Sequence, residues 1–238
     1  MKHTTSDITL ERIYTLQDAI LNSHLKNNSQ AAIFVKRSLE VCLNRNAYCI
    51  NSSKCNRDSL RTFDVLFQEA LSSLSVAYRV GLWGTTTDCY AILRNVMEGL
   101  GFISDIVDKG DFVDVFKLMD EDRLKGRYIE KRLKHDKVLT KTIGIISDLA
   151  SHFTPKRMAQ RVFVLDGKQF ARVGAAYYQK DNDLTRRLGY LLNTTWYAVT
   201  ILKEFYEKYH KDCINKTFLT EFRSLEKLYN KLATIKLT

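Results

Sequence analysis

The sequence contains little proline and glycine, the residues that form most turns in β-rich proteins. Among 238 residues there is one proline, Pro155, and there are ten glycines. An all-β chain of this length needs many tight turns and would use more of both residues. The scarcity therefore argues against an all-β fold and favours long helices, which need few turns.

Long uninterrupted apolar segments are also missing. No stretch approaches the roughly 18–20 apolar residues that cross a bilayer. The beginning of the sequence, MKHTTSDITLERIYTL, lacks the apolar run and the small-residue cleavage site of a secretory signal. We therefore expect a cytoplasmic protein with no membrane partner.

The cysteines show no disulfide or metal-binding pattern. There are five, an odd number, and Cys49 and Cys55 do not form a Cys-x-x-Cys pair. No His or Cys residues have the spacing of a zinc site. The glycine-rich phosphate-binding motifs and the Gly-x-Ser-x-Gly motif of hydrolases are absent as well. The sequence thus predicts reduced cysteines, no metal and no cofactor.

The positive charge is concentrated in the second half of the chain. The hydrophobic fraction of 45% and the charged fraction of 27% are ordinary for a folded protein, while the formal net charge is +10. Residues 1–120 contain 13 Lys and Arg against 14 Asp and Glu, whereas residues 121–238 contain 24 against 13. This asymmetry favours an acidic partner, nucleic acid first. The alternative is a well-solvated basic surface that keeps the protein soluble.

The apolar pattern predicts an all-α, multi-helix bundle. Residues 57–82 and 86–108 carry apolar side chains at helical spacing. The short Gly- and Thr-containing segment between them predicts a long antiparallel helical hairpin at the core. The Asn- and Ser-rich stretch 44–56 is expected to be a loop.

The remaining elements are expected to belong to the same domain. We predict one helical domain over residues 1–238, in which N-terminal helices within 6–50 pack on a core of residues 57–210. A last helix is expected over 217–235. The one strand-like segment lies near 161–173, where β-rich arms flank an Asp-Gly pair, a pattern typical of a short β-hairpin.

The predicted helix over 86–108 is apolar over most of its surface yet contains Arg94 and Glu98. Their i,i+4 spacing places both side chains on one face. A helix that is apolar on nearly all sides is expected at the centre of a bundle. Because a buried charge is costly unless it is paired, one interpretation is a core ion pair that fixes the helix register.

The other interpretation of this pair is a binding or catalytic site. Asp88 lies near the start of the same predicted helix, and Tyr78 and Arg79 lie near the end of the preceding one. His152 occupies a break in the helical pattern, next to a proline-containing segment. Around one cavity, these side chains could bind a phosphate or perform acid–base chemistry.

A basic cluster with an interleaved aromatic residue follows residue 120. Its members are Arg127, Tyr128, Lys131, Arg132 and Lys134. On a helix, the cations could follow phosphates while the tyrosine stacks on a base. Because acidic residues are intermixed with the cluster, a charged outer face is the alternative.

Two short motifs resemble those of a broad group of uncharacterised bacterial helical proteins. The motifs are Tyr78-Arg79 followed by Tyr90-x-x-Leu93-Arg94-x-x-x-Glu98, and Ser151-His152-x-Thr154-Pro155. The resemblance covers about residues 60–205, and the wider architecture is similar to HEPN (higher eukaryotes and prokaryotes nucleotide-binding) helical domains. It implies a helical hairpin fold and RNA nuclease activity in bacterial defence or toxin–antitoxin systems.

The sequence departs from the HEPN nucleases in their main motif. Those enzymes carry an Arg followed, after four to six residues, by a His. None of the five histidines here has an Arg at that distance, and the nearest pair, Arg127 and His135, has seven residues between. RNase activity of that type is therefore in doubt, and Arg94, Glu98 and His152 are either a relic or a different site.

Three functions stay open at this point. The first is association with nucleic acid, RNA in particular, through the basic half 121–238, in a bacterial defence or toxin–antitoxin context. The second is a non-catalytic protein-interaction module, including a homo-oligomer, built on the 12 Phe and 12 Tyr of the chain. The third is a small-ligand or phosphate-binding enzyme that uses Arg94, Glu98 and His152. The sequence leaves both an enzyme and a non-catalytic protein open.

Overall fold

The structure is a computed structural model of the chain. It describes residues 10–26, 30–50, 57–83, 86–110, 112, 141, 143–147, 162–165, 168–171 and 182–234. This part of the chain is predominantly α-helical, which confirms the all-helical class.

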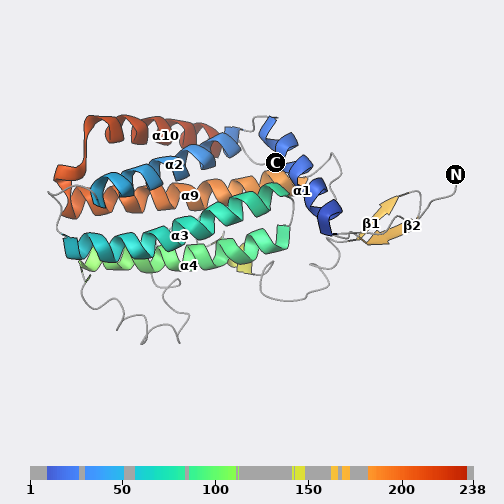
Figure 1. The fold of residues 1–238 in the computed structure, drawn as a ribbon, viewed down its shortest axis with the longest axis horizontal. Coiled ribbons are helices and arrows are strands. Elements are labelled where there is room, and N and C mark those ends of the chain that lie inside the picture. Colours follow the sequence, from blue (N-terminus) through green and yellow to red (C-terminus); the bar gives the residue numbers. More distant parts are fainter. Residues whose placement is uncertain are drawn as a thin grey trace.

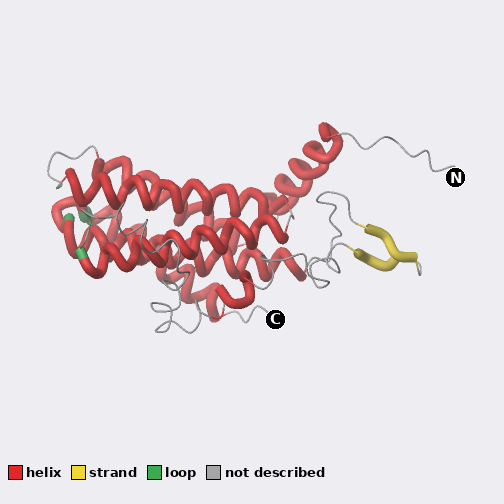
Figure 2. Tube along the Cα trace, turned by 90° about the horizontal axis from the view of Figure 1, so that it is seen from below, coloured by secondary structure: helices red, strands yellow, loops and turns green. Residues whose placement is uncertain are grey.

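The elements follow one another along the chain as shown in Figure 1. The helices are α1 (Leu10–Lys26), α2 (Gln30–Ile50), α3 (Arg57–Trp83), α4 (Thr86–Lys109), α9 (Asn182–Tyr209), the 3-10 helix η1 (Lys211–Cys213) and α10 (Lys216–Thr234). Two short strands, β1 (Val162–Leu165) and β2 (Lys168–Ala171), lie between α4 and α9 in the sequence. Helices α2, α3, α4, α9 and α10 lie side by side, and α1 joins the bundle at an angle (Figures 1 and 2).

The helix α3 illustrates why these segments are helical. Its buried side chains recur every three or four residues, so one face enters the core while the other meets water. The residues on that face are Phe63, Phe67, Ala70, Leu71, Leu74 and Ala77. Phe63 stacks on Phe205 of α9, with ring centroids 3.7 Å apart and planes inclined by 3°.

Hydrogen bonds between helices fix their relative directions. Tyr206 near the end of α9 donates to Asn46 near the end of α2, and Tyr209 of α9 donates to the carbonyl of Val107 at the end of α4. The three helices α2, α4 and α9 therefore run parallel. Helix α3 runs antiparallel to them, because only residues 84 and 85 separate it from α4 and the two helices pack along their lengths (Figure 1).

Helix α2 corrects the expectation of a loop over residues 44–56 for its first part, 44–50, while 51–56 lie outside the described residues. It continues to Ile50, because Arg45 and Asn46 face the bundle and are buried beyond the last buried apolar residue, Cys42. The spacing of these three residues continues the helical period. The polar character of these residues does not end the helix, because their side chains face the bundle.

The two strands form an antiparallel ribbon, with Val162 opposite Ala171 and Leu165 opposite Lys168. The ribbon lies apart from the helices in two views at right angles (Figures 1 and 2). An isolated hairpin is only marginally stable in water, which favours packing on the bundle. Such packing is not seen in the described part of the chain.

Among the described residues, no helix combines the length and apolar character that crossing a membrane requires.

Candidate functional site

The pair Arg94 and Glu98 forms the ion pair that its spacing predicts, but not in the core. Nε of Arg94 lies 3.1 Å from Oε1 of Glu98, and the two side chains are 39% and 42% exposed. Helix α4 packs against α3 and α9, and the pair lies on a part of its surface where both side chains reach water. The expected core ion pair is therefore wrong. Apolar composition does not determine how many neighbours surround a helix.

The other predicted residues near this pair do not join it. The hydroxyl of Tyr78 donates to the carbonyl of Ala32 at 3.2 Å, which fastens α3 to α2. Burial, followed by the charge of Glu40, raises the pKa of Tyr78. Among the described residues, no hydrogen bond or ion pair connects Tyr78 to Arg94 or Glu98.

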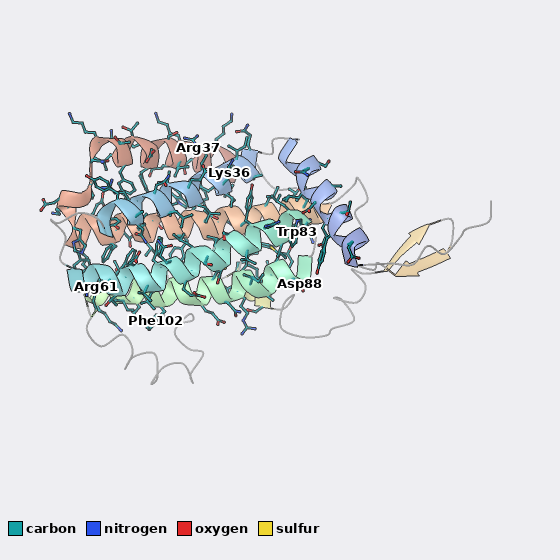
Figure 3. All side chains as sticks on the ribbon, viewed as in Figure 1. Lys36, Arg37, Arg61, Trp83, Asp88 and Phe102 are labelled. Atoms are coloured by element: carbon teal, nitrogen blue, oxygen red, sulfur yellow. The ribbon has the colours of Figure 1, made fainter. Side chains whose placement is uncertain are left out.

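Arg79 and Asp88 lie at the same end of the α3–α4 hairpin. The guanidinium carbon of Arg79 lies 4.8 Å from the ring centroid of Trp83, a cation–π contact at the end of α3. Figure 3 shows Trp83 and Asp88 at this end and Arg61 at the opposite end of α3. Asp88 is exposed in the first turn of α4, where a carboxylate is favoured by the helix dipole.

The remaining candidates lie outside the described residues. They are His152, Arg127, Tyr128, Lys131, Arg132 and Lys134. The convergence of His152 with Arg94 and Glu98 therefore stays a prediction, and so does the helical basic face.

A fully buried arginine that the sequence pattern does not indicate lies close to the α3–α4 turn. Arg187, in the first turns of α9, is 0% exposed and donates from Nε to the carbonyl of Gly81 at 2.9 Å. The thiol of Cys89 points to the carbonyl of Ala77 at 3.4 Å. Burial raises the pKa of Cys89 to about 12, although Arg187 acts in the opposite direction. A thiol with such a pKa is a core group and not a nucleophile at neutral pH.

A second buried polar network lies at the other end of the bundle, where α2 and α9 end and α3 begins. The amide of Asn46 donates to Oδ1 of Asp64 at 3.1 Å and accepts from the hydroxyl of Tyr206 at 3.1 Å. Burial raises the pKa of Asp64, while a hydrogen bond from Gln68 acts against it. The network links three helices through one amide.

Arg45 belongs to the same end and is the more unusual residue. Its side chain is only 7% exposed, yet Nε and Nη2 are buried without a hydrogen-bond partner among the described residues. Its guanidinium carbon lies 4.6 Å from the ring centroid of Tyr48, 5.1 Å from that of Phe218 and 5.9 Å from that of Tyr206. The charge thus lies close to three aromatic rings, while Nε and Nη2 have no acceptor among the residues that the structure describes.

The described residues contain no group of three or more His, Cys, Asp or Glu side chains placed to hold a metal ion. The chain matches no protein-family model, no curated protein and no solved structure.

Proposed function

We propose that the protein associates with nucleic acid, RNA in particular, through the basic segment 121–181. The charge distribution carries this proposal. The five helices α2, α3, α4, α9 and α10 together hold 16 Lys and Arg against 13 Asp and Glu, so the bundle is nearly neutral. Residues 121–181 hold 14 against 7. The excess positive charge is therefore concentrated in a segment of the sequence that lies outside these five helices, and such a segment favours binding to phosphates.

The topology gives this segment more length than the fold needs. Helices α4 and α9 are parallel neighbours, so residues 110–181 lead from the end of one back to the start of the other. A helix of 24 residues is roughly 36 Å long, a distance that about eleven extended residues can cover. Connections much longer than necessary are often functional.

Parts of this connection are fastened to the bundle. Phe112 is buried and meets Phe205 and Tyr209 edge-on, with ring centroids 5.6 and 5.0 Å apart. Ile146 is 0% exposed and belongs to the core. The most basic stretch, 121–141, lies in the sequence between these two anchors, so a nucleic acid bound there would be held close to the bundle.

The proposal is limited to association. A bacterial defence or toxin–antitoxin role is the context that the HEPN resemblance implies, and RNA is the ligand that it favours. Cleavage is not proposed, because the Arg–His spacing of the HEPN nucleases is absent.

The test is a binding titration with a labelled single-stranded RNA of about 20 nucleotides at two salt concentrations. Counterion release predicts that affinity falls steeply as salt rises. A variant with Arg127, Lys131, Arg132 and Lys134 all changed to Gln should lose up to about 3 units of the log–log salt slope, at roughly 0.7 per contact.

The matched control changes the same number of exposed cations on α10 to Gln. These are Lys216, Arg223, Lys227 and Lys231. Both variants have the same net charge. A loss of RNA affinity that is confined to the variant at positions 127, 131, 132 and 134 would therefore place the binding site in the basic segment. Absence of binding at low salt, or equal losses in both variants, contradicts the proposal.

A protein-interaction or oligomerising role is the second candidate, and the surface of α3 favours it. Val65 and Val76 are 61% and 49% exposed, and their separation of eleven residues places them on the same face. Light scattering tests this role. We expect a concentration-dependent dimer that Val65→Lys with Val76→Lys dissociates, and a monomer at all concentrations would contradict the role.

A further inference from the structure

We propose that Arg45, near the end of α2, binds a small oxyanion that presents two oxygen atoms, such as a phosphate or carboxylate group. The site lies where α2 and α9 end and α10 begins, and its walls are Tyr48, Tyr206 and Phe218. None of these residues belongs to the basic segment 121–181 or to the Arg94–Glu98 pair. The inference does not depend on nucleic-acid binding.

The two unpartnered nitrogens of Arg45 belong to the same edge of the guanidinium. Nη2 is the terminal nitrogen trans to Cδ, so one of its N–H bonds points in the same direction as that of Nε. This edge donates two parallel hydrogen bonds to a carboxylate or a phosphate. Both atoms are buried, and neither has an acceptor among the residues that the structure describes. A single group with two oxygen atoms could therefore accept both hydrogen bonds of this edge.

The protein does not supply that group from the described residues. No ion pair joins Arg45 to a carboxylate there. Asp64, in the adjoining network, accepts from Asn46 instead. Burial raises the pKa of Asp64, which disfavours its charged form. A buried cation without a counter-charge is costly, so an anion from solution would lower the free energy of the site.

The aromatic rings hold the guanidinium without satisfying its edge. The three cation–π contacts stabilise the positive charge. A ring face offers no oxygen to an N–H group, however, so the hydrogen-bonding capacity of Nε and Nη2 is unused. The rings preorganise the donor group, which reduces the entropy lost when a ligand binds.

Tyr48 marks the side from which a ligand can reach Arg45. Its side chain is 53% exposed, while Arg45 beneath it is 7% exposed. Both residues lie in the last two turns of α2, which ends at Ile50. Helix ends open locally at low free-energy cost, and an exposed ring can swing into water with little loss of buried area.

The test measures the thermal unfolding midpoint of the full chain during titration with sodium phosphate or sodium acetate. Sodium chloride keeps the ionic strength constant, so non-specific effects of the net charge of +10 are matched. We expect a saturable rise with at least one of the two anions. A response to phosphate alone assigns a tetrahedral ligand group, and a response to acetate alone assigns a carboxylate.

Arg45→Lys is the diagnostic variant, because lysine keeps the charge but lacks the two-donor edge. Its affinity for the anion should be about tenfold weaker, which corresponds to the loss of one charge-assisted hydrogen bond. Arg37→Lys, on the exposed side of the same helix, is the matched control and should bind as the unchanged protein does. If Arg45→Lys is poorly folded, Arg45→Met, which keeps an unbranched apolar stem but has no charge, should fold and show no anion effect.

Two results would overturn the proposal. One is the absence of any saturable effect of phosphate and acetate above that of chloride, which would leave Arg45 as a structural cation held by aromatic rings. The other is an effect of equal size in the Arg45 variants. RNA affinity should be the same in Arg45→Lys as in the unchanged protein, so this inference and the nucleic-acid proposal can fail separately.

Discussion

Arg187 donates a hydrogen bond from Nε to the carbonyl oxygen of Gly81 at 2.9 Å, across 106 positions of sequence. Arg187 is fully buried near the start of α9, and Gly81 lies in the last turn of α3. The backbone carbonyls at the end of a helix have no partner within it and carry the negative end of its dipole. The bond therefore fastens the start of α9 to the α3–α4 hairpin. This is the point at which the chain returns from the long connection.

Replacing Arg187 by Leu should lower the free energy of unfolding by about 2 kcal/mol, because the buried carbonyl of Gly81 loses its donor. Urea denaturation followed by circular dichroism measures the change. Arg186→Leu is the matched control, since Arg186 is the exposed neighbour on the same turn. Its effect should stay within about 0.5 kcal/mol. Equal effects of the two substitutions would show that the bond to Gly81 contributes nothing.

Gly81 itself should not tolerate a methyl group. A Cβ at this position would lie 3.0 Å from the sulfur of Cys89 and 3.1 Å from Cδ1 of Leu191, and both neighbours are fully buried. Gly81→Ala should therefore destabilise the protein by about 1–2 kcal/mol through overpacking, even though alanine is the better helix former. The midpoint of urea unfolding measures the change.

Gly99 provides the control, because no atom lies within 4 Å of the position that its Cβ would occupy. Gly99→Ala should stabilise the protein by up to about 1 kcal/mol. Cys89→Ala should partly rescue Gly81→Ala by removing the closest atom. A stabilising effect of Gly81→Ala would mean that the close approach of the helices is not a constraint.

The helical class could be predicted because it depends on local pattern. Helix α3 has a regular apolar period, and the predicted range 57–82 compares with Arg57–Trp83 in the structure. For α4 the predicted range 86–108 compares with Thr86–Lys109. The position of α4 was harder to infer, because hydropathy measures each residue and not the number of helices around it.

The buried polar residues could not be identified from the sequence. Arg45, Asn46 and Arg187 are buried through partners that lie far away in the chain, such as Tyr206, which is 160 positions from Asn46. No local signal distinguishes such an arginine from an exposed one. The regular spacing of Cys42, Arg45 and Asn46 was the one available clue that α2 continued.

The ion pair between Arg94 and Glu98 should contribute little to stability. Both side chains are more than a third exposed, so water screens their attraction. A double-mutant cycle with Arg94→Ala and Glu98→Ala should give a coupling energy of at most about 0.5 kcal/mol, decreasing with salt. A coupling above about 2 kcal/mol would point to burial that the exposed fractions do not support.

The stability of the protein should depend on pH through His210. This residue is 5% exposed, and the centroid of its ring lies 5.1 Å from that of Phe205. Burial lowers its pKa from the ordinary value of 6.5. Because the folded chain resists the protonation that the unfolded chain undergoes near 6.5, the contribution is fully present above that pH. It decreases as the pH falls below 6.5, by at most about 1.4 kcal/mol per pH unit.

His210→Gln removes the titrating ring, so the free energy of unfolding of this variant should vary less between about pH 7.5 and 5.5. Urea titrations of both proteins across this pH range measure the difference between their free energies of unfolding. The contributions of the other histidines are the same in both proteins and cancel in this difference. Asp64 has the opposite sign, because burial raises its pKa above 3.8 and its contribution is lost as the pH rises. Parallel pH profiles of the two proteins would show that His210 is protonated as easily in the folded chain as in the unfolded one.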